Sequence, residues 1–465
     1  MIELTSSADN MPFIVTSTTK RSIQDKRKFI RSHVMRRKNG KTLPSRPPSW
    51  IDGQRVTSMT TTKNEYILPG PIRIAGGFAL ANLSTELSPA IFESIYQLRE
   101  GMSPPVIGTS SSQTDKSWFE PIWSDPACLH FTIFIAKACQ DYLQGQKEYS
   151  KFALTHLVKA LGLLRQRVAF GASEKSTSDS TIVVVVGLTM VAIALGDFEV
   201  SKMHLDGLHK MVILRGGITA FFQNKLLQTK ILSADLGVSL STGCKPLFFS
   251  RDISWHPYIT SHGRTSTFGG QRLQVPMSAS DLEHFLGGLD TRLRFIWDDL
   301  AEFVRAANIA AQCKLDIDID LYREVMVSIH YRLLNLYFET SNVNETIRLA
   351  LLTFSSALFL QRRSIQTRYA YLSERFKASL TNATCDTGPM PARLTLWLYI
   401  TGAVSAFGED EQAWFLPVLA RTFRSMGCKS WNEVESLLKS VLWVDIPFGA
   451  SAKRIVKVIL DPIII

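Results

Sequence analysis

The chain has 465 residues, of which 45% are hydrophobic, 20% charged and 10% aromatic, and this balance excludes a disordered, collagenous or low-complexity protein. Six cysteines are too few for a disulfide scaffold, and Met1 to Asn10 lacks the apolar core of a signal peptide, so we expect a reducing intracellular compartment. Of the net charge of +11, the segment from Lys20 to Arg46 carries +10, with eleven Lys and Arg against Asp25. A chain-wide basic surface is therefore excluded.

Residues 1–50 are predicted to be a basic N-terminal arm, largely disordered, with one short helix in which Ile23, Ile30 and Val34 share a stripe. The arm could be a merely solvated charged segment, but its charge contrasts sharply with the rest of the chain. We predict that it serves nuclear import or contacts phosphates without base specificity. The candidate residues are Lys26, Arg27, Lys28, Arg31, Arg36, Arg37 and Lys38.

Residues 51–117 are predicted to be a mostly irregular linker. Residues 57–62 are almost all Thr and Ser, and residues 108–115 are polar and rich in turn formers. One helix is expected within this stretch, at residues 89–99.

From Trp118 to Asp445 the pattern is helical, which predicts an all-α body of packed antiparallel helical hairpins. The clearest stripe is Leu289, Leu293, Ile296, Leu300, Phe303, Val304 and Ala307. Further helices are expected at 126–143, 147–168, 199–215, 221–236, 321–338, 344–361, 365–379, 392–406, 411–426 and 434–442. Residues 446–465 are set apart as a C-terminal tail.

The apolar run from Ile182 to Leu195 begins with β-branched residues that favour a strand, but it continues without a break into further helix-forming residues. A membrane span needs about 20 residues, and this run is shorter. We therefore interpret it as one buried helix and expect no membrane association.

Several local patterns mark helix ends. Ser280 with Glu283, and Ser430 with Glu433, have the spacing of capping boxes. The pair Gly216-Gly217 is expected to stop the helix before it. Asp316, Asp318 and Asp320 resemble the start of a calcium loop, but the glycine and glutamate that such a loop requires are missing, so Asp320 is expected to cap the following helix.

Motifs for metal, cofactor or catalytic chemistry are not apparent. No two cysteines lie within four residues of each other, which argues against a zinc cluster. His204 and His209 are about 140° apart around one helix, so they are poorly placed to share a metal. Phosphate-binding, dinucleotide and nucleophile-elbow motifs are missing. We expect no metal, no cofactor and no enzymatic activity, and name no catalytic residue.

Four phrases in order resemble the fungal-specific transcription factor family, in the regulatory region that usually follows a Zn₂Cys₆ cluster. They are FIVTSTTKRSIQDKRKFIRSHVMRRKNGK in the arm, FEPIWSDPACLHFTIFIAKACQDYLQ from Phe119, HLDGLHKMVILRGGI from His204, and the closing LWLYITGAVSAF…WF…SWNEVESLLKSVLWVD that ends at Asp445. They cover about residues 12–50 and 118–445. The zinc cluster of that family is missing, and residues 446–465 differ from its usual end.

The resemblance implies a nuclear, transcription-factor-like regulatory protein without its own zinc cluster. Its expected partners are nuclear import factors, transcription co-regulators or zinc-cluster transcription factors, and DNA bound non-specifically through the arm. One alternative is a helical interaction or ligand-sensing scaffold without a DNA role. Another is an unrecognised helical enzyme, which a pocket with converging carboxylates or histidines would favour.

Overall fold

The computed structural model describes residues 88–102, 121–146, 148–169, 174–249, 253–257, 280–362, 367–386 and 390–460. Within these ranges the chain forms helices and no β-strand, as the sequence predicts. The elements are α3 Pro89–Gly101, α5 Pro126–Leu143, α6 Lys151–Ala169, α7 Asp179–Ala194, α8 Phe198–Leu214, η1 Ile218–Phe221, α9 Lys225–Thr242, α10 Ser280–Gly287, α11 Thr291–Cys313, α12 Ile319–Leu334, α13 Val343–Ser355, η4 Ser356–Leu360, α14 Ala370–Asp386, α15 Ala392–Ser405, η5 Glu409–Glu411, α16 Gln412–Met426, α17 Trp431–Lys439 and α18 Asp445–Leu460.

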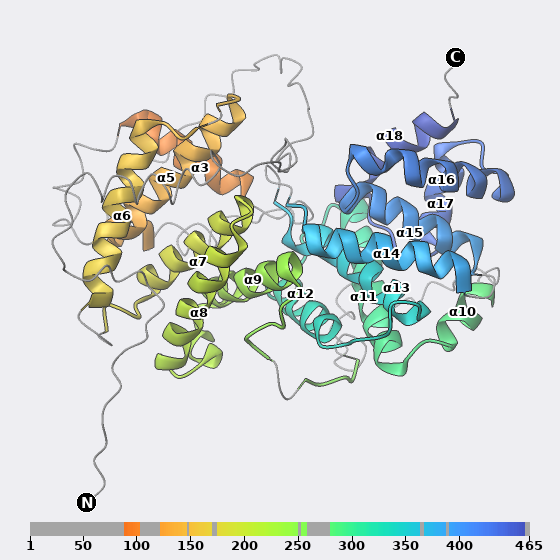
Figure 1. Ribbon diagram of the computed structural model, residues 1–465, viewed down its shortest axis with the longest axis horizontal. Coiled ribbons are helices and arrows are strands. Elements are labelled where there is room, and N and C mark those ends of the chain that lie inside the picture. The colour runs from red at the N-terminus through yellow and green to blue at the C-terminus, as the bar shows by residue number, and fades with distance from the viewer. Residues whose placement is uncertain are drawn as a thin grey trace, which may run out of the picture.

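Consecutive helices pack as antiparallel hairpins: α5 with α6, α7 with α8, α13 with α14, and α15 with α16. Figure 1 shows the earlier hairpins, coloured orange to yellow-green, on one side of the molecule and α13 to α18 on the other. Helix α9 lies between them and packs against α7, α8, α12 and α14. The body is therefore joined through one central helix.

The apolar patterns explain these positions. In α9 the residues from Ile231 to Ser241 are all buried, which suits a helix that is covered on every side. The predicted stripe is buried, with Leu293, Ile296 and Leu300 of α11 fully covered and Leu289 buried just before the helix, while the opposite face of α11 is mostly half-buried. These two helices illustrate how the core runs through both halves of the body.

The run at Ile182–Leu195 forms most of helix α7 and is largely buried, so the helical interpretation is confirmed over the strand alternative. Elsewhere, the 18-residue stretch Val343–Leu360 is long and apolar enough to cross a membrane, with a mean hydropathy of 1.2. It is 89% buried inside the body, where it forms α13 and the π-helical turn η4. Burial against other helices accounts for the apolar character of this stretch.

The expected cap of α12 is wrong, whereas a helix does begin at Ser280. Helix α12 is capped by Asp318, whose carboxylate accepts from the backbone N–H of Asp320 at 2.9 Å, whereas Asp320 itself lies in the first turn. Helix α11 is capped by Asp290, and Ser280 begins a separate short helix, α10. At the start of α12 two aspartates could serve as the cap, and the local pattern does not decide between them.

Other local signals are confirmed. Ser430 Oγ accepts from the backbone N–H of Glu433 at 3.4 Å, and the Glu433 carboxylate accepts from the N–H of Lys429 at 2.7 Å. Helix α8 ends before Gly216 and Gly217, which have φ values of 98° and 89°. The N–H of Gly217 bonds to the carbonyl of Val212 at 2.9 Å, as in a Schellman ending.

Residues 446–460 of the segment set apart as a tail belong to α18. Phe448, Ala452 and Val456 of this helix are buried, and the helix packs against α15, α16 and α17. Within the segment interpreted as a linker, α3 packs on α5 and buries Ile95. Both helices extend the folded body beyond the range 118–445.

Candidate functional site

The seven basic residues predicted for import or nucleic-acid contact lie outside the residues that the structure describes. They are Lys26, Arg27, Lys28, Arg31, Arg36, Arg37 and Lys38. Of the four phrases that resemble the family, the structure describes those in the helical body.

Asp125 belongs to a set of polar contacts that joins α5, α6 and α7, and we call such a set a polar tie. The Asp125 carboxylate caps α5 by accepting from the N–H of Cys128 at 3.0 Å, and its two oxygens lie 2.9 Å from Nη2 of Arg167 on α6. Arg167 also donates to the hydroxyl of Thr181 on α7 at 3.2 Å. The charged side chains are each only 16% exposed, so solvent screens this pair weakly.

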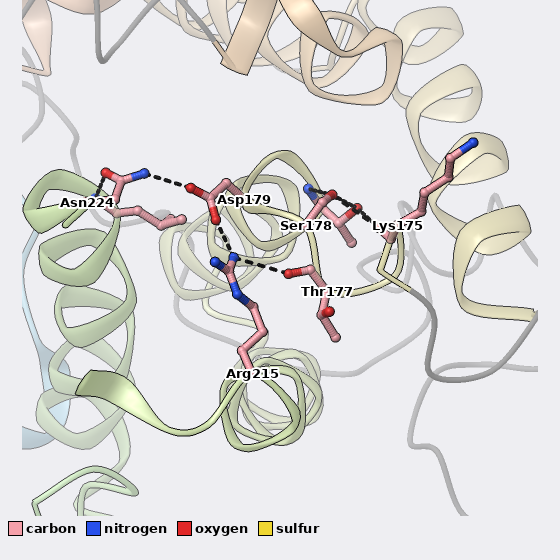
Figure 2. Close-up of polar contacts among 8 residues, drawn as sticks. Lys175, Thr177, Ser178, Asp179, Arg215 and Asn224 are labelled. Atoms are coloured by element: carbon pink, nitrogen blue, oxygen red, sulfur yellow. Dashed lines mark hydrogen bonds and ion pairs between the residues drawn. The ribbon is translucent and has the colours of Figure 1, made fainter. Parts of the chain in front are cut away.

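The second polar tie involves Arg215 of the sequence Leu214-Arg215-Gly216-Gly217, which we call the LRGG phrase. Figure 2 shows it. The guanidinium of Arg215 pairs with Asp179 at the start of α7 and donates to the carbonyl of Thr177 at 3.3 Å. The other Asp179 oxygen accepts from Asn224 at 2.8 Å, and Asn224 caps α9. Arg215 also lies 4.5 Å from the ring centroid of Phe221. Arg215 thus joins the end of α8 to the start of α7, and Asp179 joins α7 to the cap of α9.

The glycine pair leaves three large apolar side chains in solvent. Ile213 and Leu214 at the end of α8 are 57% and 54% exposed, and Phe222 after η1 is 64% exposed. We call these three residues the α8 corner. Exposed apolar side chains that form a contiguous patch often mark a contact surface, whereas scattered ones are ordinary.

A buried carboxylate, Asp235 of α9, holds the segment after that helix. It accepts from the N–H groups of Leu247 and Phe248 at 2.9 and 3.1 Å and from the hydroxyl of Tyr331 at 2.7 Å. Burial raises the pKa of Asp235, and the three donated hydrogen bonds oppose that rise. These contacts give the carboxylate a structural role, since each donor belongs to the body itself.

Burial displaces the pKa values of Lys230 and Cys128, and displaced pKa values can mark a functional site. Burial lowers the pKa of Lys230 to about 8, with Arg362 and Arg323 acting in the same direction. Burial raises the pKa of Cys128 to about 12, which disfavours the reactive thiolate. Lys230 lines neither of the two cavities described below, so its altered pKa is not matched to a binding pocket.

Three of the described histidines are buried inside the body: His130, His156 and His330. His130 and His156 lie in the α5–α6 hairpin with their Nδ1 atoms 2.9 Å apart, a contact in which one ring donates and the other accepts. His330 is fully buried, and its Nδ1 lies 2.8 Å from the carbonyl of Met326. Along the described chain, no group of three or more His, Cys, Asp or Glu residues is placed to hold a metal ion.

Two hollows differ in size. A groove of about 410 Å³ runs beside α3 and is lined by polar and apolar side chains of α3, by Lys137 and Gln140 of α5, and by Phe152 of α6. A cavity of about 10 Å³ lies at the π-helical turn η4, beside α14 and α15. The groove contains one acid, Glu93, and one base, Lys137, so its charge favours no particular ligand.

Asp125 and Arg215 lie in the phrases that resemble the family, but the sequence predicted no partner for either. Arg167, Asp179 and Asn224 were missed, since they carry no local signal and their partners lie 36 to 45 residues away along the chain. In the comparisons with known proteins, no family model matches the chain, and no curated protein or solved structure is significantly similar to it.

Proposed function

We propose that this chain is a nuclear, transcription-factor-like regulatory protein that acts through protein contacts made by its helical body. The observation that carries the proposal is the use of the family-like phrases in the fold. Asp125, from one phrase, joins α5 to Arg167 of α6, and Arg215, from another phrase, joins the end of α8 to the start of α7. Residues shared with a regulatory domain would be expected to maintain such a scaffold.

Two further features support this proposal. The α8 corner offers Ile213, Leu214 and Phe222 to a partner at the end of the LRGG phrase. The arm carries almost the whole net charge of the chain, which suits nuclear import and weak contact with phosphates. In this proposal the cationic arm directs the protein to the nucleus, and the nearly neutral body contacts its partners.

A reporter experiment tests the regulatory role. The full-length chain is fused to a heterologous DNA-binding domain in a fungal host, and transcription from a promoter carrying its site is compared with that given by the DNA-binding domain alone. We expect the fusion to change transcription. Reporter activity equal to that of the DNA-binding domain alone would contradict a regulatory role.

A variant of the same fusion tests the protein contacts. Changing Ile213, Leu214 and Phe222 to Ser should reduce the effect, because apolar side chains at a contact surface supply much of its affinity. The matched control is Tyr337→Ser, since Tyr337 is 77% exposed and lies outside the α8 corner. Equal activity of all three fusions at equal protein levels would place the contact surface elsewhere.

The nuclear part is tested separately with a tagged full-length chain in which Lys26, Arg27, Lys28, Arg31, Arg36, Arg37 and Lys38 are changed to Ala. We expect the tagged protein to move to the cytoplasm. Unchanged nuclear accumulation would mean that the arm does not direct import.

A further inference from the structure

A small cavity lies where α13 passes into the π-helical turn η4. Its volume is about 10 Å³, and its lining includes Tyr369 and four residues with aliphatic hydroxyl groups: Thr353, Ser356, Ser373 and Ser405. These four come from α13, η4, α14 and α15, so the cavity lies at the seam between two of the hairpins. A π turn is wider than an α turn, which explains why space is left at this point.

Two of these hydroxyl groups lack a hydrogen-bond partner among the residues that the structure describes. Thr353 Oγ1 and Ser405 Oγ are both inaccessible to solvent and unpartnered. The other two are already engaged, since Ser373 Oγ donates to the carbonyl of Ala406 at 3.1 Å and Ser356 Oγ lies 3.5 Å from Nε2 of His330. Buried hydroxyl groups without partners destabilise a fold, so each such group requires an explanation.

The size and the chemistry of the cavity agree. A space of about 10–15 Å³ accommodates one water molecule, which needs two to four polar partners to be held. We propose that one ordered water molecule binds in this cavity and bridges Thr353 on α13 to Ser405 on α15. Because each hydroxyl both donates and accepts, a water molecule can satisfy both. Anything larger than water exceeds the available volume.

The direction of a stability change distinguishes a hydrated cavity from a dry one. Thr353→Val keeps the side-chain shape and removes the hydroxyl. In a hydrated cavity the change removes a hydrogen bond to the water, so the unfolding midpoint in denaturant falls. In a dry cavity it removes an unpartnered hydroxyl, so the midpoint rises. The matched control is Thr189→Val in α7, whose buried hydroxyl donates to the carbonyl of Val185 at 2.9 Å and whose loss should lower the midpoint.

A double variant adds an independent reading. If one water joins the two sites, Thr353→Val and Ser405→Ala together should lower the midpoint by less than the sum of the single changes, because the water is lost once. Additive changes that raise the midpoint would overturn the proposal.

The unchanged full-length chain provides the direct test. A crystal structure at about 2 Å or better should show a density peak within about 3.2 Å of both Thr353 Oγ1 and Ser405 Oγ. A cavity without density, or a peak that contacts neither oxygen, would overturn the proposal whatever the variants do.

Discussion

Arg167 and Asp125, 42 residues apart in the chain, meet with Nη2 of the arginine 2.9 Å from both oxygens of the carboxylate. Arg167→Ala should lower the free energy of unfolding by about 2 kcal/mol, since it removes charged hydrogen bonds to Asp125 and Thr181 from a poorly solvated site. Arg454→Ala, which changes an exposed arginine of α18, is the matched control and should cost less than about 0.5 kcal/mol. Urea denaturation of the three proteins measures the difference. Equal midpoints for both variants would contradict the structural role of the tie.

A more deeply buried pair predicts a larger effect. Arg332 and Asp299 lie 2.7 Å apart with side chains 3% and 0% exposed. Asp299→Ala leaves the guanidinium buried without its carboxylate, so the free energy of unfolding should fall by about 3–5 kcal/mol. Glu199→Ala breaks the exposed pair with Lys202, in which Lys202 is 37% and Glu199 84% exposed, and should cost far less than Asp299→Ala. Similar losses in thermal or urea unfolding would refute the importance of burial here.

Alanine substitutions at two glycines should change the stability of the fold in opposite directions. A Cβ at Gly187 would lie 2.1 Å from Cε1 of Phe131, so Gly187→Ala should destabilise the fold by about 1–3 kcal/mol through overpacking. A Cβ at Gly162 in α6 would meet no atom within 4 Å, so Gly162→Ala should stabilise the fold by up to about 1 kcal/mol through helix propensity. Equilibrium unfolding of both variants checks the prediction. A stabilised Gly187→Ala protein would show that α5 and α7 pack less closely than described.

His330 predicts a pH dependence. Burial lowers its pKa to about 4, whereas an unfolded histidine has a pKa of about 6.5. Between these values the unfolded chain binds more protons, so stability should fall as pH decreases from about 6.5 to about 4. The loss attributable to this residue approaches about 3 kcal/mol. His330→Gln should flatten the profile in that window, and parallel profiles for the two proteins would rule out the contribution.

The arm predicts salt-dependent binding to DNA. Six to eight phosphate contacts would give a slope of roughly −5 to −7 for log K against log salt, with little preference between unrelated duplexes. The variant with Ala at Lys26, Arg27, Lys28, Arg31, Arg36, Arg37 and Lys38 retains four of the eleven bases. Its slope should therefore be no steeper than about −4. Fluorescence anisotropy at several salt concentrations measures both slopes. An unchanged slope, or a strong preference for one duplex, would favour docking of Ile23, Ile30 and Val34 on a protein partner over the electrostatic role.

Features that depend on a few neighbouring residues could be predicted from the sequence. The buried stripe of α11, the end of α8 at Gly216 and the cap at Ser430 follow from helical periodicity, from the positive φ that glycine permits and from a short-range hydrogen bond. The all-α class follows from the same periodicity repeated along the chain. The choice of Asp318 over Asp320 as the cap of α12 did not follow, because both side chains could serve and their surroundings differ only in the fold. There Asp320 pairs with Lys225, 95 residues earlier.

The basic arm and its separation from a nearly neutral body were determined by the sequence alone, because charge is a property of composition. The partners of Asp125, Arg215 and Asp235, the packing of α18, and the hydroxyl-lined cavity at η4 were decided by the tertiary structure. A polar side chain in a one-dimensional sequence has many possible partners. When the helices pack together, water is removed from the buried polar groups. Each buried charge or hydroxyl is then left with the few neighbours that can form an ion pair or hydrogen bond with it.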